Sequence, residues 1–231
     1  MKFINAALLA LSLSFALLPS NAIAGLDEGV AAYKKGDFAT ALREFKLLAE
    51  KGNAKAQADL GTLYEKGEGV AQDYKEAVKW YRLAADQGDA EAQKQLGVMY
   101  DEGQGVTQDH KEAMKWFRLA ADQGDADAQY SLGLSYAIGN TKDYKEAFKW
   151  YRLAADQGHA SAQHHVGVSY ESGTGVTKDH KEAMKWFRLA ADKGDFVAQL
   201  LLGSMYEEGK GVAQDYKEAI KWYRLAADQG S

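Results

Sequence analysis

Histidine offers this chain its most direct route to chemistry, because an imidazole can bind a metal ion or carry a proton near neutral pH. There are five histidines, and three of them, His159, His164 and His165, lie within seven residues. No two of these three are three or four residues apart, the spacing that directs two rings to one metal from one helix face. A divalent metal would therefore need carboxylates from another segment. We predict no metal site, and we interpret His110 and His180 as surface residues.

Other patterns that could support catalysis are weak. No arrangement of Ser, His and Asp is recognisable, and the many carboxylates are explained by helix caps and solvated faces. The segment Gly67-Glu68-Gly69-Val70 could be taken for a phosphate-binding loop, but no Lys-Ser/Thr pair follows it. We interpret it as a helix end and a turn that tucks Val70 into the core. The sequence thus predicts no catalytic residues and no cofactor.

A repeated 14-residue string dominates the rest of the chain. It reads Lys-Glu-Ala-x-Lys-Trp-(Tyr/Phe)-Arg-Leu-Ala-Ala-Asp-x-Gly and occurs five times. All five Trp residues belong to it, with spacings of 36, 34, 36 and 36, at Trp80, Trp116, Trp150, Trp186 and Trp222. Such a period indicates an array of small units, each too small to bury its own apolar face. An array presents a long surface, which favours a binding scaffold over an enzyme.

Each unit contains two predicted helices. In the first unit, helix A spans 54–66 and ends at Gly67, while helix B begins after Asp73 and ends at Gly88. Asp73 and Glu76 have the spacing of a capping box, in which the Glu side chain reaches back to the backbone N–H of the Asp. The repeats are 54–89, 90–125, 126–159, 160–195 and 196–231, and a degenerate unit at 25–53 precedes them.

Positions that keep their identity between copies predict the core. Gly61 and its equivalents lie in the middle of helix A, where Gly costs about 1 kcal/mol relative to Ala. Its repetition predicts that a neighbouring helix or a bulky ring approaches closely. The predicted core positions of the first copy are Ala56, Gln57, Leu60, Gly61 and Tyr64 in helix A, with Ala77, Trp80, Leu83 and Ala84 in helix B.

The first 24 residues have the pattern of a secretory signal peptide. Lys2 precedes a mainly apolar run at 3–18, and Ala22-Ile23-Ala24 supplies the small residues of a cleavage site. The run is shorter than the roughly 20 residues of a membrane-spanning helix. We therefore expect cleavage after Ala24, a periplasmic or secreted protein, and no membrane insertion after cleavage.

Charge and cysteine content exclude further classes. The formal net charge is −5, and loss of Lys2 with the signal peptide changes it to −6. Nucleic acid would require a basic surface, which this interspersed, mildly acidic sequence does not offer. The chain has no Cys, so packing between repeats must replace disulfides as the source of stability.

The repeat resembles the Sel1-like repeat, a relative of the tetratricopeptide repeat, over 54–231. The resemblance implies an all-α, right-handed α-solenoid of antiparallel helix pairs, with the A helices lining a concave groove that binds a protein or peptide partner. It also extends to Cys-rich exported relatives linked to β-lactamase activity, from which this chain departs in having no Cys. A β-lactamase-like enzyme and a secreted host-interaction factor are the alternatives. The matching residues of the second copy are Ala92, Leu96, Gly97, Tyr100, Gly103, Gly105, Val106, Asp109, Ala113, Trp116, Ala120, Ala121 and Gly124.

Helix A also contains positions that differ between copies, and the resemblance places a partner there. They become more apolar toward the C-terminus, where Phe196, Val197, Leu200, Leu201 and Leu202 form nearly a whole apolar helix face. Such a face is typical of an interface, and self-association through this last repeat is a second interpretation. The predicted partner-binding residues are Lys94, Gln95, Tyr130, Leu134, His164, His165, Val197, Leu200 and Leu201.

Overall fold

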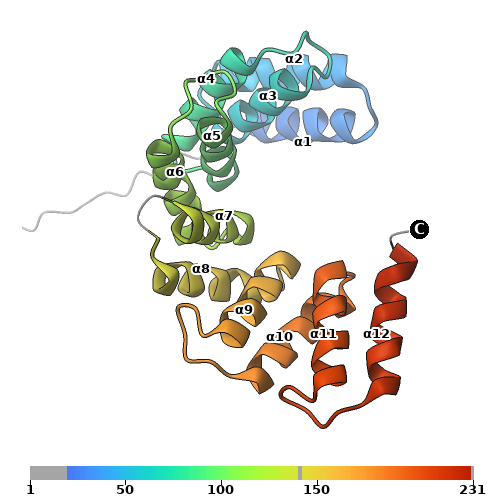
Figure 1. The fold of residues 1–231 in the computed structure, drawn as a ribbon. Helices are drawn as coiled ribbons and strands as arrows, with labels where there is room; N and C mark the ends of the chain where they lie inside the picture. Colours follow the sequence, from blue (N-terminus) through green and yellow to red (C-terminus); the bar gives the residue numbers. More distant parts are fainter. Residues whose placement is uncertain (1–19, 140–141, 230–231) are drawn as a thin grey trace, which may run out of the picture.

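The chain folds into a curved array of helix pairs (Figure 1). The structure, a computed structural model, describes residues 20–139 and 142–229, and this part contains helices and no strand. Most of the predicted signal peptide lies outside the described residues. The helices are α1 (Ser20–Lys34), α2 (Phe38–Ala49), α3 (Ala54–Lys66), α4 (Tyr74–Ala85), α5 (Ala90–Glu102), α6 (His110–Asp122), α7 (Ala126–Ile138), α8 (Tyr144–Asp156), α9 (Ala160–Ser172), α10 (His180–Asp192), α11 (Phe196–Glu208) and α12 (Tyr216–Gln229).

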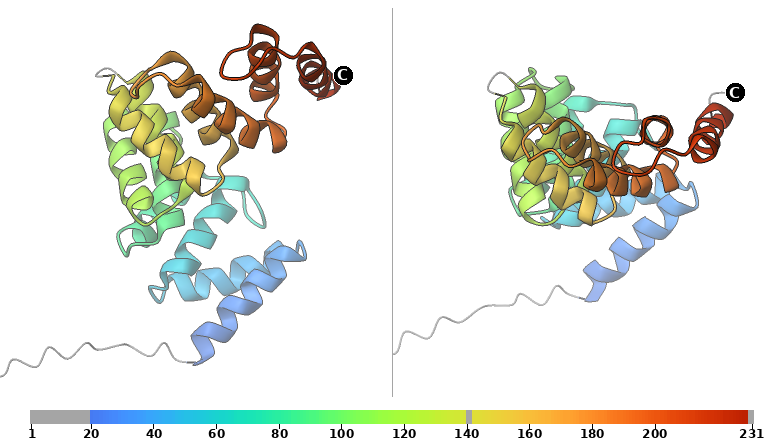
Figure 2. Two further views of the ribbon diagram at one scale, coloured as in Figure 1. Left: turned by 90° about the horizontal axis from the view of Figure 1, so that it is seen from below. Right: turned by 60° about the horizontal axis from the view of Figure 1, so that its bottom comes forward.

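Each helix packs against the one before it and the one after it, which makes the molecule an all-α solenoid. In Figure 1 the array curves like the letter C, with α5, α7, α9 and α11 on its inner side. Figure 2 shows from two further directions that the array also rises out of a single plane. The odd-numbered A helices therefore line the inside of the curve, as predicted.

The helix bounds confirm most of the local predictions. Helix α3 spans the predicted residues and ends at Gly67, whose φ of 72° is the left-handed conformation that Gly tolerates. The side chain of Asp73 accepts hydrogen bonds from the backbone N–H groups of Lys75 and Glu76, at 2.9 and 3.1 Å. Helix α4 ends at Ala85, so the prediction that it extends to Gly88 was three residues too long.

The capping-box prediction was half wrong. The backbone N–H of Asp73 donates to the carbonyl oxygen of Tyr64 at 2.9 Å, so it is not available to Glu76. Glu76 instead pairs with Lys79, whose Nζ lies 3.1 Å from its carboxylate. The Asp-to-Tyr backbone bond recurs in the other four copies and ties the start of each helix B to the end of its helix A.

A ring of helix B lies directly on the repeated glycine of helix A. A Cβ atom added to Gly61 would lie 2.7 Å from the ring of Tyr81, and one added to Gly97 would lie 2.6 Å from the ring of Phe117. No side chain fits at such distances, which confirms the predicted close approach. The degenerate unit uses the same contact between Gly29 and Phe45.

The ring that fills this space is a core residue that the sequence analysis missed. Tyr81 is fully buried, while Leu83, which we predicted in the core, is 43% exposed. Tyr81 and Ala84, three residues apart, share the buried face of α4, whereas Leu83 is two positions from Tyr81 and therefore lies on the other side of the helix. The equivalent leucines are exposed to a similar extent, at Leu119, Leu153, Leu189 and Leu225.

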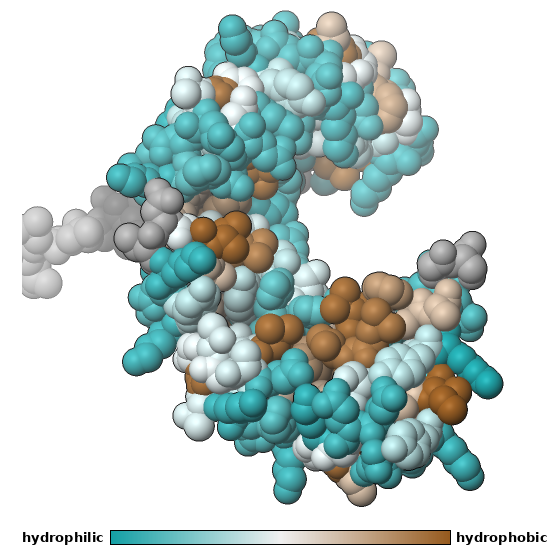
Figure 3. Space-filling model, viewed as in Figure 1, coloured by the Kyte–Doolittle hydropathy of each residue, from teal (hydrophilic) through white to brown (hydrophobic). Residues whose placement is uncertain are grey.

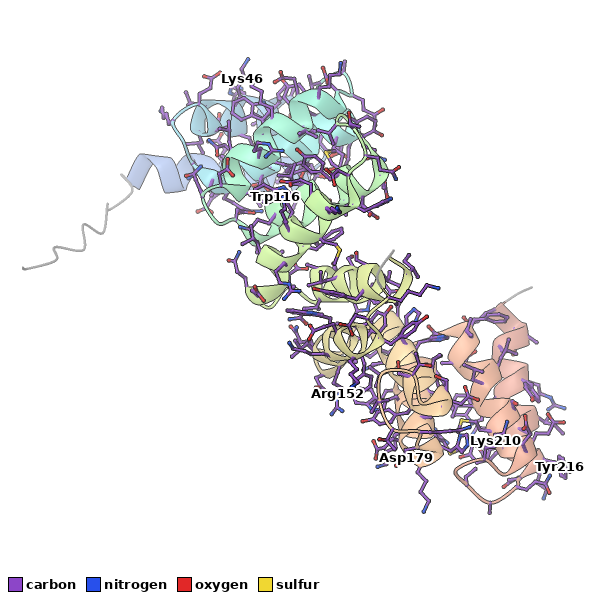
Figure 4. All side chains as sticks on the ribbon, turned by 60° about the vertical axis from the view of Figure 1, so that its left-hand side comes forward. Lys46, Trp116, Arg152, Asp179, Lys210 and Tyr216 are labelled. Atoms are coloured by element: carbon purple, nitrogen blue, oxygen red, sulfur yellow. The ribbon has the colours of Figure 1, made fainter. Side chains whose placement is uncertain are left out.

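The repeated Trp residues stabilise the junctions between units. Trp116, Trp150, Trp186 and Trp222 are buried, as predicted, whereas Trp80 is half-buried. An Arg of the preceding unit lies over each of these four buried rings, a cation–π contact worth about 0.5–2 kcal/mol. The guanidinium carbon of Arg152, for example, lies 4.7 Å from the Trp186 ring centroid, and Figure 4 labels Trp116 and Arg152.

A buried glutamine provides a second link between units. Gln57 donates from Nε2 to the carbonyl oxygen of Ala49 in the preceding unit at 3.1 Å. Its Oε1 accepts from Gln87 at 2.7 Å. The fourth unit differs because Lys193 occupies the place of Gln87 and bonds to the carbonyl of Gly158. Gln163 Oε1 is consequently buried without a hydrogen-bond partner among the described residues.

We expect Lys193→Gln to raise the free energy of unfolding by about 1 kcal/mol, because it restores the missing bond to a buried acceptor. Urea unfolding followed by circular dichroism measures the change. Lys178→Gln is the matched control, since the equivalent glutamine bond, from Gln72 to Glu65, is exposed. Equal effects of the two substitutions would contradict the assignment.

Candidate functional site

The nine predicted partner-binding residues lie on four helices that line the inside of the curve (Figure 1). We call these nine residues the inner stripe. Helix α5 contributes Lys94 and Gln95, α7 contributes Tyr130 and Leu134, α9 contributes His164 and His165, and α11 contributes Val197, Leu200 and Leu201.

The first part of the inner stripe is polar and internally paired. Lys94 Nζ lies 2.9 Å from a carboxylate oxygen of Glu91 and 3.3 Å from Asp127 on the next A helix. Gln95 also donates to Glu91, at 2.7 Å. Burial of Lys94 disfavours its charge, but the hydrogen bond to Glu91 and the nearby carboxylates outweigh burial and raise its pKa. Lys94 is therefore a charged residue that already has partners.

Aromatic and imidazole rings form the middle of the inner stripe. Tyr130 stacks on His159, with ring centroids 4.6 Å apart and an interplanar angle of 25°. His165 stacks on Tyr151, with centroids 4.8 Å apart and an angle of 14°. The Tyr130 and His165 rings are 5.7 Å apart, so the two stacks are in contact.

Two members of this ring cluster, His159 and Tyr151, were not predicted as site residues. His159 takes the helix-capping position that Asp or Asn occupies in the other copies, and its Nδ1 accepts the backbone N–H of Ala162 at 3.2 Å. Its neutral tautomer then carries hydrogen on Nε2, which faces Asp127 at 3.4 Å. For His159, the only sequence signal was the presence of a histidine at a helix-cap position. Tyr151 gave none, because its position is aromatic in every copy.

His164 and His165 have different environments although they are adjacent. His164 Nδ1 lies 3.1 Å from a carboxylate oxygen of Asp195, the cap residue of α11. Burial lowers the pKa of His165 to about 4, with a smaller contribution in the same direction from His164. His165 is consequently neutral at pH 7 and belongs to the packing of the ring cluster.

The last part of the inner stripe is apolar. Val197 and the neighbouring Phe196 are each 45% exposed, while Leu200 and Leu201 are half-buried. Leu202, which we predicted on the same apolar face, is fully buried in the core instead. Figure 3 shows apolar surface on the C-terminal arm, facing the hollow of the molecule.

A metal or membrane site has no support in residues 20–139 and 142–229. No group of three His, Cys, Asp or Glu residues there could hold a metal ion. No helix in the same ranges is both long and apolar enough to cross a membrane.

The fold and the inner stripe define a helical repeat protein whose copies differ along one surface. Five consecutive segments match the model of the Sel1 repeat, at 54–89, 90–125, 126–159, 160–195 and 197–231. The chain therefore belongs to the Sel1 repeat family. No curated protein matches the sequence closely.

Several solved structures are similar. One is c5321, a protective antigen present in uropathogenic Escherichia coli strains, with 42% identity and a TM-score of 0.87 over 91% of this chain. The chain spans 46% of the length of that protein. A Sel1 repeat protein from Oxalobacter formigenes has 37% identity and a TM-score of 0.81, with 91% of this chain and 83% of that chain covered. An immunity protein from Pseudomonas aeruginosa, PA5088, shares the fold at 20% identity and a TM-score of 0.54, with 92% of this chain and 83% of that chain covered.

We expect stability to fall as the pH decreases from about 6.5 toward 4, because the unfolded chain protonates His165 while the folded protein resists it. Between pH 7 and pH 4.5 the loss should be about 1–2 kcal/mol, less than the full linkage value because the ring is partly solvated. Other groups also titrate in this range, so the measurement is the difference between wild type and His165→Leu in urea unfolding across pH.

The Leu side chain is the one found at the equivalent position of the fifth copy, Leu201. The control is His110→Tyr, which replaces an exposed imidazole with the residue found at this position in the first, third and fifth copies. An unchanged slope in His165→Leu would show that His165 is not the residue responsible.

Proposed function

We propose that this protein is an exported, non-enzymatic scaffold that binds a protein or peptide partner along the inner stripe. The observation that carries the proposal is the contrast between copies. Buried positions such as Gln57 and Gly61 are identical in all five repeats, whereas the inner stripe changes at every repeat. Variation on one surface of an otherwise uniform array is what specific recognition of an irregular partner requires.

The side chains of the inner stripe indicate which kind of partner surface they would contact. Lys94 is held by carboxylates, so a partner gains little by pairing with it unless those contacts break. The exposed apolar side chains of α11 have no such partners among the described residues, and contact with another apolar surface would remove them from water. We therefore place the main contact at the C-terminal half, with an apolar segment of the partner.

Self-association through the fifth repeat is the second candidate, and a particular observation favours it. Ile220 of α12 is 50% exposed, and Phe196 and Val197 of α11 are each 45% exposed. Contact with a second copy of the chain would remove these apolar side chains from water.

Tyr130→Ala, His164→Ala and Leu200→Ala combined should reduce recovery of the partner about tenfold, the effect of losing a small number of central contacts. The measurement is affinity capture from the native cell envelope with the tagged mature protein. The matched control combines Leu83→Ala, Leu153→Ala and Leu189→Ala, which removes exposed side chains from the B helices.

Circular dichroism must show that both triple variants are folded. Equal recovery by the inner-stripe variant and wild type would exclude the inner stripe as the binding surface. Recovery of untagged copies of the chain itself would favour self-association.

Export leads to a separate expectation about the N-terminus. Helix α1 begins at Ser20, so cleavage after Ala24 would remove its first five residues and leave Gly25 as the new start. Intact-mass measurement of protein from the periplasm and the medium should find a chain of residues 25–231. Ala24→Tyr should block cleavage, because signal peptidases need small residues at this position. A full-length chain in the cytoplasm would rule out export.

A further inference from the structure

A cavity of about 180 Å³ lies between α7, α8 and α9, beside the inner stripe. Leu134 and His165 belong to both, and Ala137, Tyr151 and Val168 also line the cavity. None of the described residues that line the cavity is Asp, Glu, Lys or Arg. The wall is largely apolar, so a charged group that entered would lose its hydration without compensation.

Beside this cavity, the third repeat lacks an acidic side chain that the other copies have. Its position in α7 is Ala137, where the other four repeats have Glu or Asp. In the first repeat this residue, Glu65, accepts a hydrogen bond from the hydroxyl of Tyr81 at 2.5 Å. In the fifth repeat the hydroxyl of Tyr223 donates to Glu207 at 2.8 Å.

Tyr151 has consequently lost its hydrogen-bond acceptor. Its residue is only 4% exposed, and its hydroxyl has no partner among the described residues. The second contact seen in the first repeat, with Thr62, is also missing because Leu134 stands at that position. A buried hydroxyl without a partner is unfavourable, and an incoming acceptor would relieve this cost.

Size and polarity together restrict the occupant. An apolar cavity of about 150 Å³ holds one benzene ring, so this one accommodates a single substituted ring. His165 is neutral at pH 7, since burial lowers its pKa to about 4, and so adds no charge to the wall. The occupant should therefore be an uncharged ring that carries one hydrogen-bond acceptor for Tyr151.

We propose that this cavity binds a tyrosine side chain of the partner, whose phenol oxygen accepts a hydrogen bond from the Tyr151 hydroxyl. The proposal rests on the proposed function, because the partner must first lie along the inner stripe. Tyrosine fits better than phenylalanine, which would fill the space but leave the Tyr151 hydroxyl without an acceptor.

The probe for this site is p-cresol, which is the tyrosine side chain without its backbone. Titrated into the mature protein and followed by ¹H–¹⁵N NMR, it should shift the amide signals of Tyr151, His165 and Val168 with a Kd of about 1 mM. Toluene, the phenylalanine analogue, should bind at least about fivefold more weakly, because the bond to a buried hydroxyl is worth about 1 kcal/mol. The anion 4-methylbenzoate should not bind.

Ala137→Glu is the decisive variant. It restores the Glu–Tyr pair of the first and fifth repeats, so the fold should tolerate it, and it places a carboxylate in the cavity. We expect p-cresol affinity to fall at least about tenfold, the equivalent of losing 1.4 kcal/mol. Thr177→Glu adds the same charge at an exposed loop position and should leave the affinity unchanged.

Three results would overturn the proposal. These are no saturable shifts with p-cresol up to about 20 mM, ten times or more above the expected Kd; equal affinity of Ala137→Glu and wild type; and equal affinity for toluene and p-cresol. Each of them concerns the cavity in the isolated protein. Loss of partner capture by the inner-stripe variant is a separate measurement, so failure of the cavity and failure of the scaffold function are distinguishable.

Discussion

The contact between a helix A glycine and a helix B ring determines how each unit of this protein closes. Gly61 costs about 1 kcal/mol of helix stability relative to Ala, yet only its missing side chain lets the Tyr81 ring approach α3 so closely. Burial of a large aromatic side chain contributes roughly 1.5–3 kcal/mol, which exceeds that cost. The same contact between a glycine and a ring recurs in all five repeats and, between Gly29 and Phe45, in the degenerate unit.

Closed units then stack through contacts that are equally repetitive. The Arg-over-Trp contact and the buried glutamine both join one unit to the next, and neither extends further than its neighbour. Stability in such an array is a sum of nearest-neighbour terms. A local change, such as Lys193 in the place of glutamine, is therefore felt at one junction and leaves the curvature of the remaining units in place.

Much of this could be predicted from the sequence, because comparing five copies separates core from surface. The ends of α3 and the Asp73 cap depend on local backbone chemistry that a short segment contains, and the close approach at Gly61 follows from the recurrence of this glycine in all five copies. Leu83 was misplaced because helical periodicity gives the width of an apolar face but not which edge of it the next unit covers. The bond from Asp73 to Tyr64 was missed because it joins two helices across a loop.

The candidate site was harder to predict for a related reason. The inner stripe follows from sequence variation, but the orphaned hydroxyl of Tyr151 follows from a residue that is absent, the acid replaced by Ala137. The loss is recognisable only by comparison with the first repeat, where the hydroxyl of Tyr81 bonds to Glu65, 16 residues away in the sequence.

The inner stripe also changes in character from one end of the array to the other, whereas the core is the same in every repeat. It passes from ion pairs around Lys94, through the stacked rings of Tyr130 and His165, to the exposed apolar side chains of α11. A partner that contacts the end around Lys94 replaces existing ion pairs with new ones. A partner that contacts the apolar end releases water, which stabilises the complex. The proposed function therefore implies that a partner with an apolar segment and a charged segment binds in one orientation more favourably than in the other. The identical repeats build the solenoid, and under this proposal the order in which they differ sets the orientation of the partner.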